Sequence, residues 1–161
     1  MPDRGTWGQA VNDFFRYLAQ AAAAAGLMAA VATAPDPAAA FGAVAIGEPA
    51  NIAKRGVAIG TGYNYPTKEG AEARALKECL AFKDAPPDTR ALCKVVKTFE
   101  RQCYAIALDP KNGTPGFGWS VMTEKTQAES AAMARCRDTA GKSRVQFCKM
   151  TASNCDAAKP Q

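Results

Sequence analysis

The sequence predicts an α+β protein made of two tandem ββαβ repeats, packed as one pseudo-twofold domain with mainly antiparallel sheet and stapled by disulfides. The first observation is a duplicated motif, Ala-Glu-x-x-Ala-x-x-x-Cys, at residues 71–79 and 128–136. The second is a Gly-x-Gly-aromatic segment followed by a threonine, at residues 60–67 and 116–123. The third is a second cysteine in each copy, followed by lysine and placed beyond the predicted helix. Chance rarely repeats such a spacing, so two copies of one unit form the protein.

The first repeat, residues 41–100, opens with a short apolar segment and a turn containing glycine and proline, which favour a β-hairpin. Strands are predicted over residues 41–46, 56–65 and 92–99, and a helix over residues 68–82. Thr67 can accept a hydrogen bond from a free amide of the first helical turn, and Glu69 suits the positive end of the helix dipole. The prolines at positions 86 and 87 lie in a segment that is expected to end this helix.

An apolar stripe predicts which side of this helix faces the sheet. Its members recur at intervals of three and four residues and are Ala71, Ala75, Leu76, Cys79 and Leu80. Such spacing places the side chains on one helical face. Cys79 is therefore expected to point inward.

The second repeat, residues 101–155, shows the same order. Strands are predicted over residues 103–108, 116–122 and 145–152, with a turn at 109–113 and a helix capped by Thr123. Fused duplicates usually bury their apolar faces against each other, so we expect the helices to cover the sheet faces. Residues 156–161 are expected to form a flexible tail.

Six cysteines allow fifteen pairings, so the connectivity is an inference from the duplication. Equivalence of the two copies favours Cys79 with Cys93 and Cys136 with Cys148, which leaves Cys103 with Cys155. The chain has no Cys-x-x-Cys motif and no histidine, which disfavours a metal site and a redox-active site. Structural disulfides are typical of an oxidising compartment.

Residues 1–40 differ in composition from the rest and are predicted to be a signal peptide or an uncleaved N-terminal membrane anchor. Residues 21–34 are an almost unbroken run of Ala, Gly, Leu, Met and Val, and three alanines at 38–40 form a cleavage site of small residues. Without cleavage, residues 17–34 would be near the lower length limit of a spanning helix.

The arginines fix the expected orientation of this segment. Arg4 and Arg16 precede the apolar run, and the next basic residue is Lys54. Positive residues remain on the cytoplasmic side, so both alternatives export the cysteine-bearing domain. We expect a periplasmic or secreted protein, the alternative being an inner-membrane protein whose domain faces the periplasm.

The charge distribution does not predict a specific nucleic-acid partner. The net charge is +5, and the lysines and arginines are scattered along the chain instead of forming a run. A solvated basic surface is the ordinary explanation of such a pattern.

No catalytic or cofactor-binding motif is recognisable, so a non-enzymatic protein without a cofactor is expected. The chain lacks histidine, the commonest general base. Acid–base chemistry would fall to carboxylates such as Glu72, Glu129 and Asp109, whose plainer role is in helix and turn electrostatics.

Four aromatic residues flank the repeated glycines and are candidates for a binding groove: Tyr63, Tyr65, Phe117 and Trp119. Their rings could line a shallow groove for a peptide strand or a glycan. The alternative is that they pack over the helices as part of the core.

Several segments together resemble the DUF4189 family, small exported bacterial domains of unknown function. The resemblance lies in F-G-A-V-A-I, Tyr-Asn-Tyr-Pro, A-E-x-x-A-L-x-x-C, C-K-V-V, C-Y-A-I-A-L and G-F-G-W-S, between residues 41 and 155. It implies export and disulfides, and it brings no established catalytic residues.

The leading hypothesis is an exported, disulfide-stabilised binding domain of the bacterial cell envelope, whose partner is a protein or an envelope component. The first alternative is an accessory subunit of an inner-membrane complex, held there through residues 17–34. The second alternative is a secreted effector or an envelope-modifying enzyme.

Overall fold

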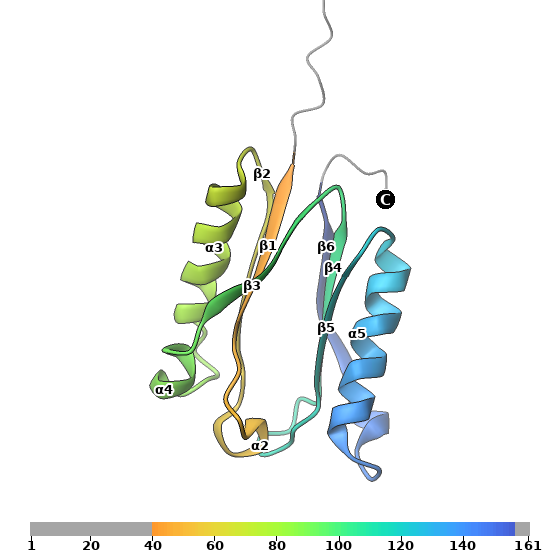
Figure 1. Ribbon diagram of the computed structural model, residues 1–161. Coiled ribbons are helices and arrows are strands. Elements are labelled where there is room, and N and C mark those ends of the chain that lie inside the picture. The colour runs from red at the N-terminus through yellow and green to blue at the C-terminus, as the bar shows by residue number, and fades with distance from the viewer. Residues whose placement is uncertain (1–39, 157–161) are drawn as a thin grey trace, which may run out of the picture. The chain divides into compact units, whose positions relative to one another are not determined.

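The computed structural model describes residues 40–156, so residues 1–39 of the expected signal peptide or anchor lie outside the described residues. Two three-stranded antiparallel sheets face each other, and one long helix covers the outer side of each sheet (Figure 1). The α+β class and the two ββαβ units are thereby confirmed. Within residues 40–156, no helix is long and apolar enough to cross a membrane.

The first repeat contains four expected elements and two short helices that were not predicted. In chain order they are β1 (Phe41–Gly47), α2 (Ile52–Arg55), β2 (Ala58–Tyr65), α3 (Lys68–Leu80), α4 (Pro87–Arg90) and β3 (Lys94–Glu100). The Asn51 side chain accepts a hydrogen bond from the Lys54 amide and so caps α2. Pro87 occupies the first turn of α4, where its missing N–H is not needed. Pro87, which was expected only to end a helix, therefore also begins one.

The second repeat departs from expectation at two places. Its elements are β4 (Cys103–Leu108), β5 (Phe117–Met122), α5 (Lys125–Ala140), the 3-10 turn η1 (Val145–Phe147) and β6 (Lys149–Cys155). The prediction that Thr123 caps the helix is wrong, because the N-cap of α5 is Glu124, which makes no capping hydrogen bond through its side chain. The predicted start of the last strand at residue 145 is also wrong, because residues 145–147 form the 3-10 turn. In the first repeat, Thr67 does cap α3 by accepting from the Gly70 amide.

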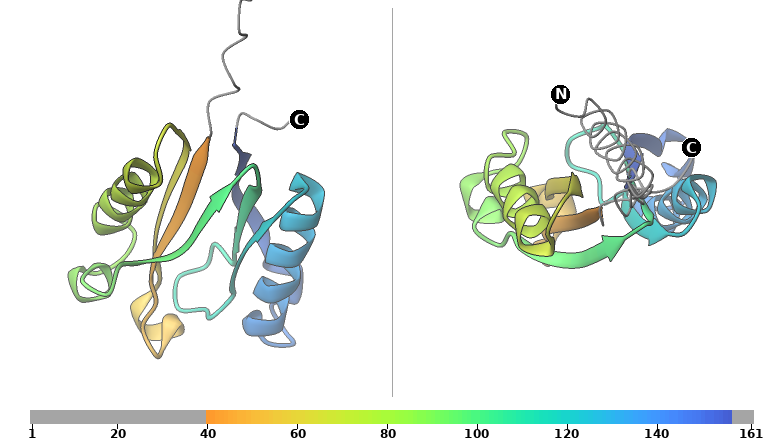
Figure 2. Two further views of the ribbon diagram at one scale, coloured as in Figure 1. Left: turned by 45° about the horizontal axis from the view of Figure 1, so that its top comes forward. Right: turned by 90° about the horizontal axis from the view of Figure 1, so that it is seen from above.

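The sheets have equivalent strand orders, β2-β1-β3 and β5-β4-β6, so the first strand of each repeat is central. Figure 2 shows β3 turning directly into β4, which carries the chain from one sheet to the other. Asp156, which the sequence analysis assigns to the tail, is buried, with 1% of its surface exposed. The flexible tail therefore cannot include Asp156, and residues 157–161 lie outside the described residues.

The largest apolar side chains lie between the two sheets. This cluster combines Val44, Ile46 and Ile59 of the first repeat with Tyr104, Ile106 and Phe117 of the second. Apolar burial of this kind is the main stabilising contribution to folding, so the repeats stabilise each other through this shared layer. The prediction that the duplicated units bury their apolar faces together is confirmed.

The helices pack on their sheets through small residues. Ala71, Ala75 and Cys79 of α3 are fully buried, whereas Leu80 is 48% exposed and does not belong to the buried stripe as predicted. A Cβ atom at Gly60 would lie 2.0 Å from the Ala75 carbonyl oxygen. The helix backbone thus approaches β2 so closely that only glycine fits, and the side of the helix toward the sheet has no room for leucine.

Candidate functional site

Glu72 and Glu129, the carboxylates of the duplicated motif, have the same structural role in both repeats. Glu72 accepts a hydrogen bond of 2.6 Å from the Thr98 hydroxyl, and Glu129 accepts one of 2.6 Å from the Ser153 hydroxyl. Each bond joins a long helix to the last strand of its repeat. Because hydrogen bonds to charged groups are stronger than neutral ones, these bonds strengthen the attachment of helix to sheet.

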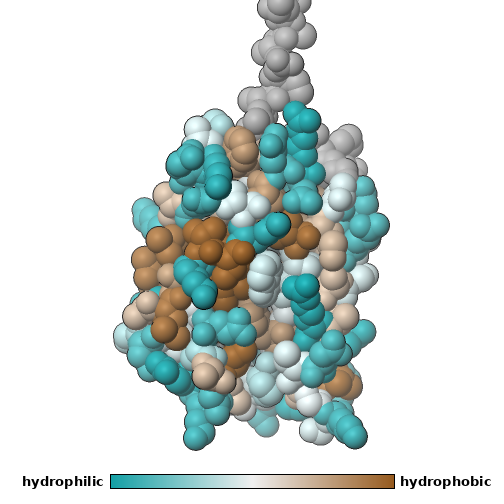
Figure 3. Space-filling view, in the orientation of Figure 1, coloured by the Kyte–Doolittle hydropathy of each residue, from teal (hydrophilic) through white to brown (hydrophobic). Residues whose placement is uncertain are grey.

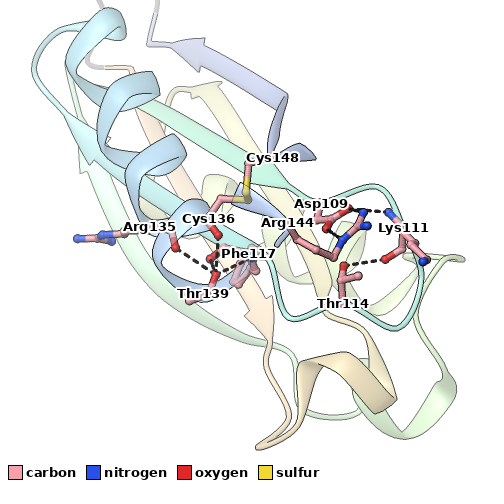
Figure 4. Close-up of a disulfide and its surroundings, with 9 residues drawn as sticks. All are labelled: Asp109, Lys111, Thr114, Phe117, Arg135, Cys136, Thr139, Arg144 and Cys148. Carbon is pink, nitrogen blue, oxygen red and sulfur yellow. Dashed lines mark hydrogen bonds and ion pairs between the residues drawn. A yellow bond between two sulfur atoms is a disulfide. The ribbon is translucent and has the colours of Figure 1, made fainter. Parts of the chain in front are cut away.

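Asp109, the third candidate carboxylate, is a buried anchor of the loop between β4 and β5 (Figure 4). Its side chain is fully buried and forms a two-pronged ion pair with the Arg144 guanidinium, including an Nη2–Oδ1 distance of 2.7 Å. The hydrogen bond from Arg144 is the main reason why the pKa of Asp109 is lowered to about 2, and the Lys111 amide also donates to it. A carboxylate held ionised in this way is a poor general acid or base near neutral pH.

The same loop is closed by further bonds around Asp109. The Thr114 hydroxyl donates to the Lys111 carbonyl oxygen, and the Asp109 amide donates to the Gly116 carbonyl oxygen. The Arg144 guanidinium also lies over the Phe147 ring, 4.4 Å from its centre. These contacts tie the loop to the segment that precedes β6.

Asp156 is a buried carboxyl group that the sequence did not single out. Its Oδ1 atom lies 3.5 Å from the Asn64 amide, and its Oδ2 atom is buried with no hydrogen-bond partner among residues 40–156. Asn64 and Arg101, whose amides both donate to this carboxyl, have positive φ angles of 61° and 52°. Burial raises the pKa of Asp156 from 3.8 to about 6, despite these donated bonds.

The raised pKa of Asp156 predicts that the folded protein becomes less stable as the pH rises from about 4 to about 7. The unfolded chain ionises near the ordinary value of 3.8 and the folded protein only near 6, so the contribution is present at pH 4 and is lost as the pH rises through about 6. We expect the free energy of unfolding to fall by about 2 kcal/mol across this range, after allowance for solvent screening. Urea denaturation at pH 4.5 and pH 7 measures the difference.

The neutral variant Asp156→Asn is the control for this prediction. Its free energy of unfolding should be nearly the same at the two pH values, because the titrating group is gone. Asp109, whose pKa is lowered to about 2, contributes to a pH dependence only at still lower pH. An equal difference in wild type and variant would contradict the role assigned to Asp156.

The four candidate aromatic residues do not lie in one groove. Tyr63 and Tyr65 line a hollow on the edge of β2, and Phe117 and Trp119 line another beside β5. At the β-bulge, Tyr63 and Asn64 of β2 together oppose Gly42 of β1. Tyr63 packs on Tyr104 between the sheets, whereas Tyr65 packs in the alanine cluster under α3. Phe117 is 5% exposed and belongs to the core between the sheets, and Trp119 is partly buried against the same core.

A larger opening lies between the repeats and was not predicted. This inter-repeat cavity has a volume of about 660 Å³ and combines segments from both halves of the chain. Its lining includes Ile46, Pro49, Ile52, Leu92, Val96 and Pro115. Leu92 is 43% exposed, and Figure 3 shows apolar side chains gathered on this face over β3. Its volume lies within the range of ligand-binding pockets, and polar and apolar side chains line it in similar measure.

Comparison with known proteins identifies the family but not an activity. The profile of the family described as Domain of unknown function (DUF4189) matches residues 41–155. The chain belongs to the DUF4189 family. No curated protein and no solved structure matches the chain significantly. The match runs from β1 through the last residue of β6, so it covers both repeats of the DUF4189 domain.

The DUF4189 domain contains three disulfides, and none of its six cysteines is free. They join Cys79 to Cys93, Cys103 to Cys155 and Cys136 to Cys148, which are the pairs expected from the duplication. Two of them connect the long helix of a repeat to the start of its last strand, and the third links β4 to β6. Three such bonds indicate an oxidising, extracytoplasmic environment. Residues 40–156 contain no group of three or more acidic, cysteine or histidine side chains placed to hold a metal ion.

Proposed function

We propose that this DUF4189 protein is an exported, non-enzymatic binding domain of the bacterial cell envelope, whose ligand is a protein or an envelope component. The observation that carries the proposal is the inter-repeat cavity, whose mixed polar and apolar lining includes the exposed Leu92. Apolar surface left open beside a disulfide-stapled core is typical of an interaction site. Lys94 and Glu48 at the same opening supply polar groups that can orient a ligand.

The carboxylates also support binding in preference to hydrolysis. Glu72 and Glu129 are engaged by hydroxyl groups of the last strands, and Asp109 is paired with Arg144. A retaining or inverting glycoside hydrolase typically needs two carboxyl groups that face one substrate site. These three instead hold helices and a loop in place, in three separate parts of the fold.

A photo-crosslinking experiment tests the proposed site in the full chain. A photo-activatable phenylalanine derivative replaces Leu92 at the cavity or, as control, Arg137 on the exposed side of α5. We expect a discrete crosslinked product in intact bacteria from position 92 and none from position 137, because only the first side chain lines the cavity. Mass spectrometry of the product identifies the partner.

The outcomes of this experiment, together with a double variant of the carboxylates, distinguish the hypotheses. No crosslink from position 92, or the same products from both positions, would contradict the binding proposal. A crosslink to one integral membrane protein, retained with residues 17–34 in the membrane fraction, would favour the accessory-subunit alternative. A position-92 crosslink that persists in the Glu72→Gln, Glu129→Gln double variant supports binding, whereas turnover of an envelope polymer that this double variant abolishes would favour an enzyme.

A further inference from the structure

The two repeats differ at the exposed edge of one strand. β2 and β5 are equivalent edge strands, because each lies at the end of its sheet beside the central strand. Alternate backbone N–H and C=O groups of an edge strand point away from the sheet and can pair with another strand. Proteins normally block such edges, and the repeats offer an internal comparison of how this is done.

The β5 edge is closed by side chains of α5. The Phe117 amide donates to the Thr139 hydroxyl over 2.9 Å, and that hydroxyl lies 2.9 Å from the Phe117 carbonyl oxygen. One turn earlier, the Arg135 guanidinium donates to the Trp119 carbonyl oxygen over 2.6 Å. The outward N–H and C=O groups of Phe117 and the C=O group of Trp119 are thus engaged within the same repeat.

At the two equivalent positions, the first repeat carries no side chain that can donate a hydrogen bond to β2. Alignment of Cys79 with Cys136 places Glu78 at the position of Arg135 and Phe82 at the position of Thr139. A carboxylate and a phenyl ring cannot donate to a carbonyl oxygen, and Glu78 is paired with Arg74 at 2.8 Å. Along this edge the structure has a hollow of about 490 Å³, lined by Thr61, Gly62, Tyr63, Asn64, Tyr65, Arg74 and Glu78.

The strand itself has only one of the usual protections of an edge, the bulge at Asn64 near its end. β2 reads Ala-Ile-Gly-Thr-Gly-Tyr-Asn-Tyr and contains neither a charged residue nor a proline. The other edge strands, β3 and β6, carry lysines, among them Lys94, Lys97 and Lys149. Charges of this kind discourage pairing with another chain, so β2 is the edge most suited to strand addition.

We propose that β2 pairs antiparallel with β2 of a second copy of this chain, across a twofold axis near Thr61. A Cβ on Gly62 would lie 3.2 Å from the Arg74 Cβ, and one on Gly60 would lie 2.2 Å from the Cys79 amide nitrogen, the residue after Glu78. Arg74 and Glu78 therefore lie on opposite sides of the Thr61 level. The twofold axis places Arg74 of each copy opposite Glu78 of the other, which makes the edge self-complementary in charge.

This interaction would join two three-stranded sheets into one six-stranded sheet, with Tyr63 of each copy packing beside the new pair. Exposed Tyr63, at 38%, supplies apolar area for this contact. The inference is independent of the proposed function, because the edge of β2 is separate from the inter-repeat cavity. Loss of self-association would leave the position-92 crosslink unchanged.

Sedimentation equilibrium of the full chain across a range of concentrations tests the proposal. We expect a monomer–dimer equilibrium that Glu78→Arg weakens by about tenfold or more, because Arg74 then faces an arginine of the second copy. The control Arg137→Glu changes an exposed charge on α5 and should leave the equilibrium unchanged. A wild-type protein that stays monomeric, or equal dissociation constants for wild type and Glu78→Arg, would overturn the proposal.

Amide hydrogen exchange provides a second measurement that needs no variant. The amides of Thr61 and Tyr63 should exchange more slowly as the protein concentration rises, whereas the Phe117 amide, bonded to Thr139, should not depend on concentration. Protection of Thr61 and Tyr63 that is the same at every concentration would overturn the proposal. It would show that a segment of the same chain covers the edge.

Discussion

Replacing Gly118 with alanine is expected to lower the free energy of unfolding by about 3 kcal/mol or more. A Cβ at this position would lie 2.2 Å from the Ala132 carbonyl oxygen and 2.5 Å from the Cys136 amide nitrogen. Both are backbone atoms of α5, so relief requires the helix to move away from β5. The Cys136–Cys148 disulfide limits that movement. Urea denaturation of the oxidised protein measures the change.

The variant Gly113→Ala is the control for Gly118→Ala. It shows how much destabilisation an alanine causes through backbone conformation alone, without a steric clash. Gly113 has a φ of +82°, and a Cβ there would lie 3.9 Å from the Ala53 carbonyl oxygen, an ordinary van der Waals distance. Gly113→Ala should therefore cost only the strain of a left-handed alanine, about 1 kcal/mol. If Gly118→Ala were no more destabilising than Gly113→Ala, the close approach of α5 to β5 would be refuted.

Removing the Cys103–Cys155 disulfide, by changing both residues to alanine, is expected to cost about 4 kcal/mol. The bond closes a loop with a sequence separation of 52, compared with 12 for Cys136–Cys148. Longer loops confine the unfolded chain more, so the shorter bond should contribute only about 3 kcal/mol. Cys103 and Cys155 also face each other across β4 and β6, so the bond holds the second sheet together directly.

Guanidinium denaturation of the two double variants, each with its remaining disulfides intact, provides the comparison. The Cys136→Ala, Cys148→Ala protein is the control, because it removes a bond of the same chemistry over a shorter loop. A greater loss of stability in that control than in the Cys103→Ala, Cys155→Ala protein would contradict the loop-length argument.

Local features of the chain predicted most of the secondary structure. β4 begins and ends at the predicted residues, and α3 begins where Thr67 caps it. These elements depend on short-range patterns, namely apolar alternation, helical spacing and capping. Two element boundaries were predicted wrongly. Thr123 was expected to cap α5, but the helix begins at Lys125 with Glu124 as its N-cap. The last strand was expected to begin at Val145, but residues 145–147 form a 3-10 turn before it.

The candidate site was less predictable because it depends on distant segments. Tyr63 and Tyr65 are candidates from the sequence for one groove, but the bulge at Asn64 places their side chains on opposite sides of β2. The inter-repeat cavity combines α2, β3 and the segment before β5, for which the sequence contains no shared pattern. The sequence assigns Asp156 to a polar tail, whereas the fold buries it beside Asn64 and Gln102.

The duplicated sequence pattern predicted the two-repeat architecture and the order of the strands and long helices, and it favoured the three cysteine pairs that the structure contains. This was possible because the same local pattern occurs once in each repeat, and equivalent positions restrict the pairings. The three-dimensional arrangement was needed to show that Glu72, Glu129 and Asp109 are engaged and where the inter-repeat cavity opens. Those properties depend on contacts between residues far apart in the chain, such as Asp109 with Arg144, whose burial and distance no local pattern specifies.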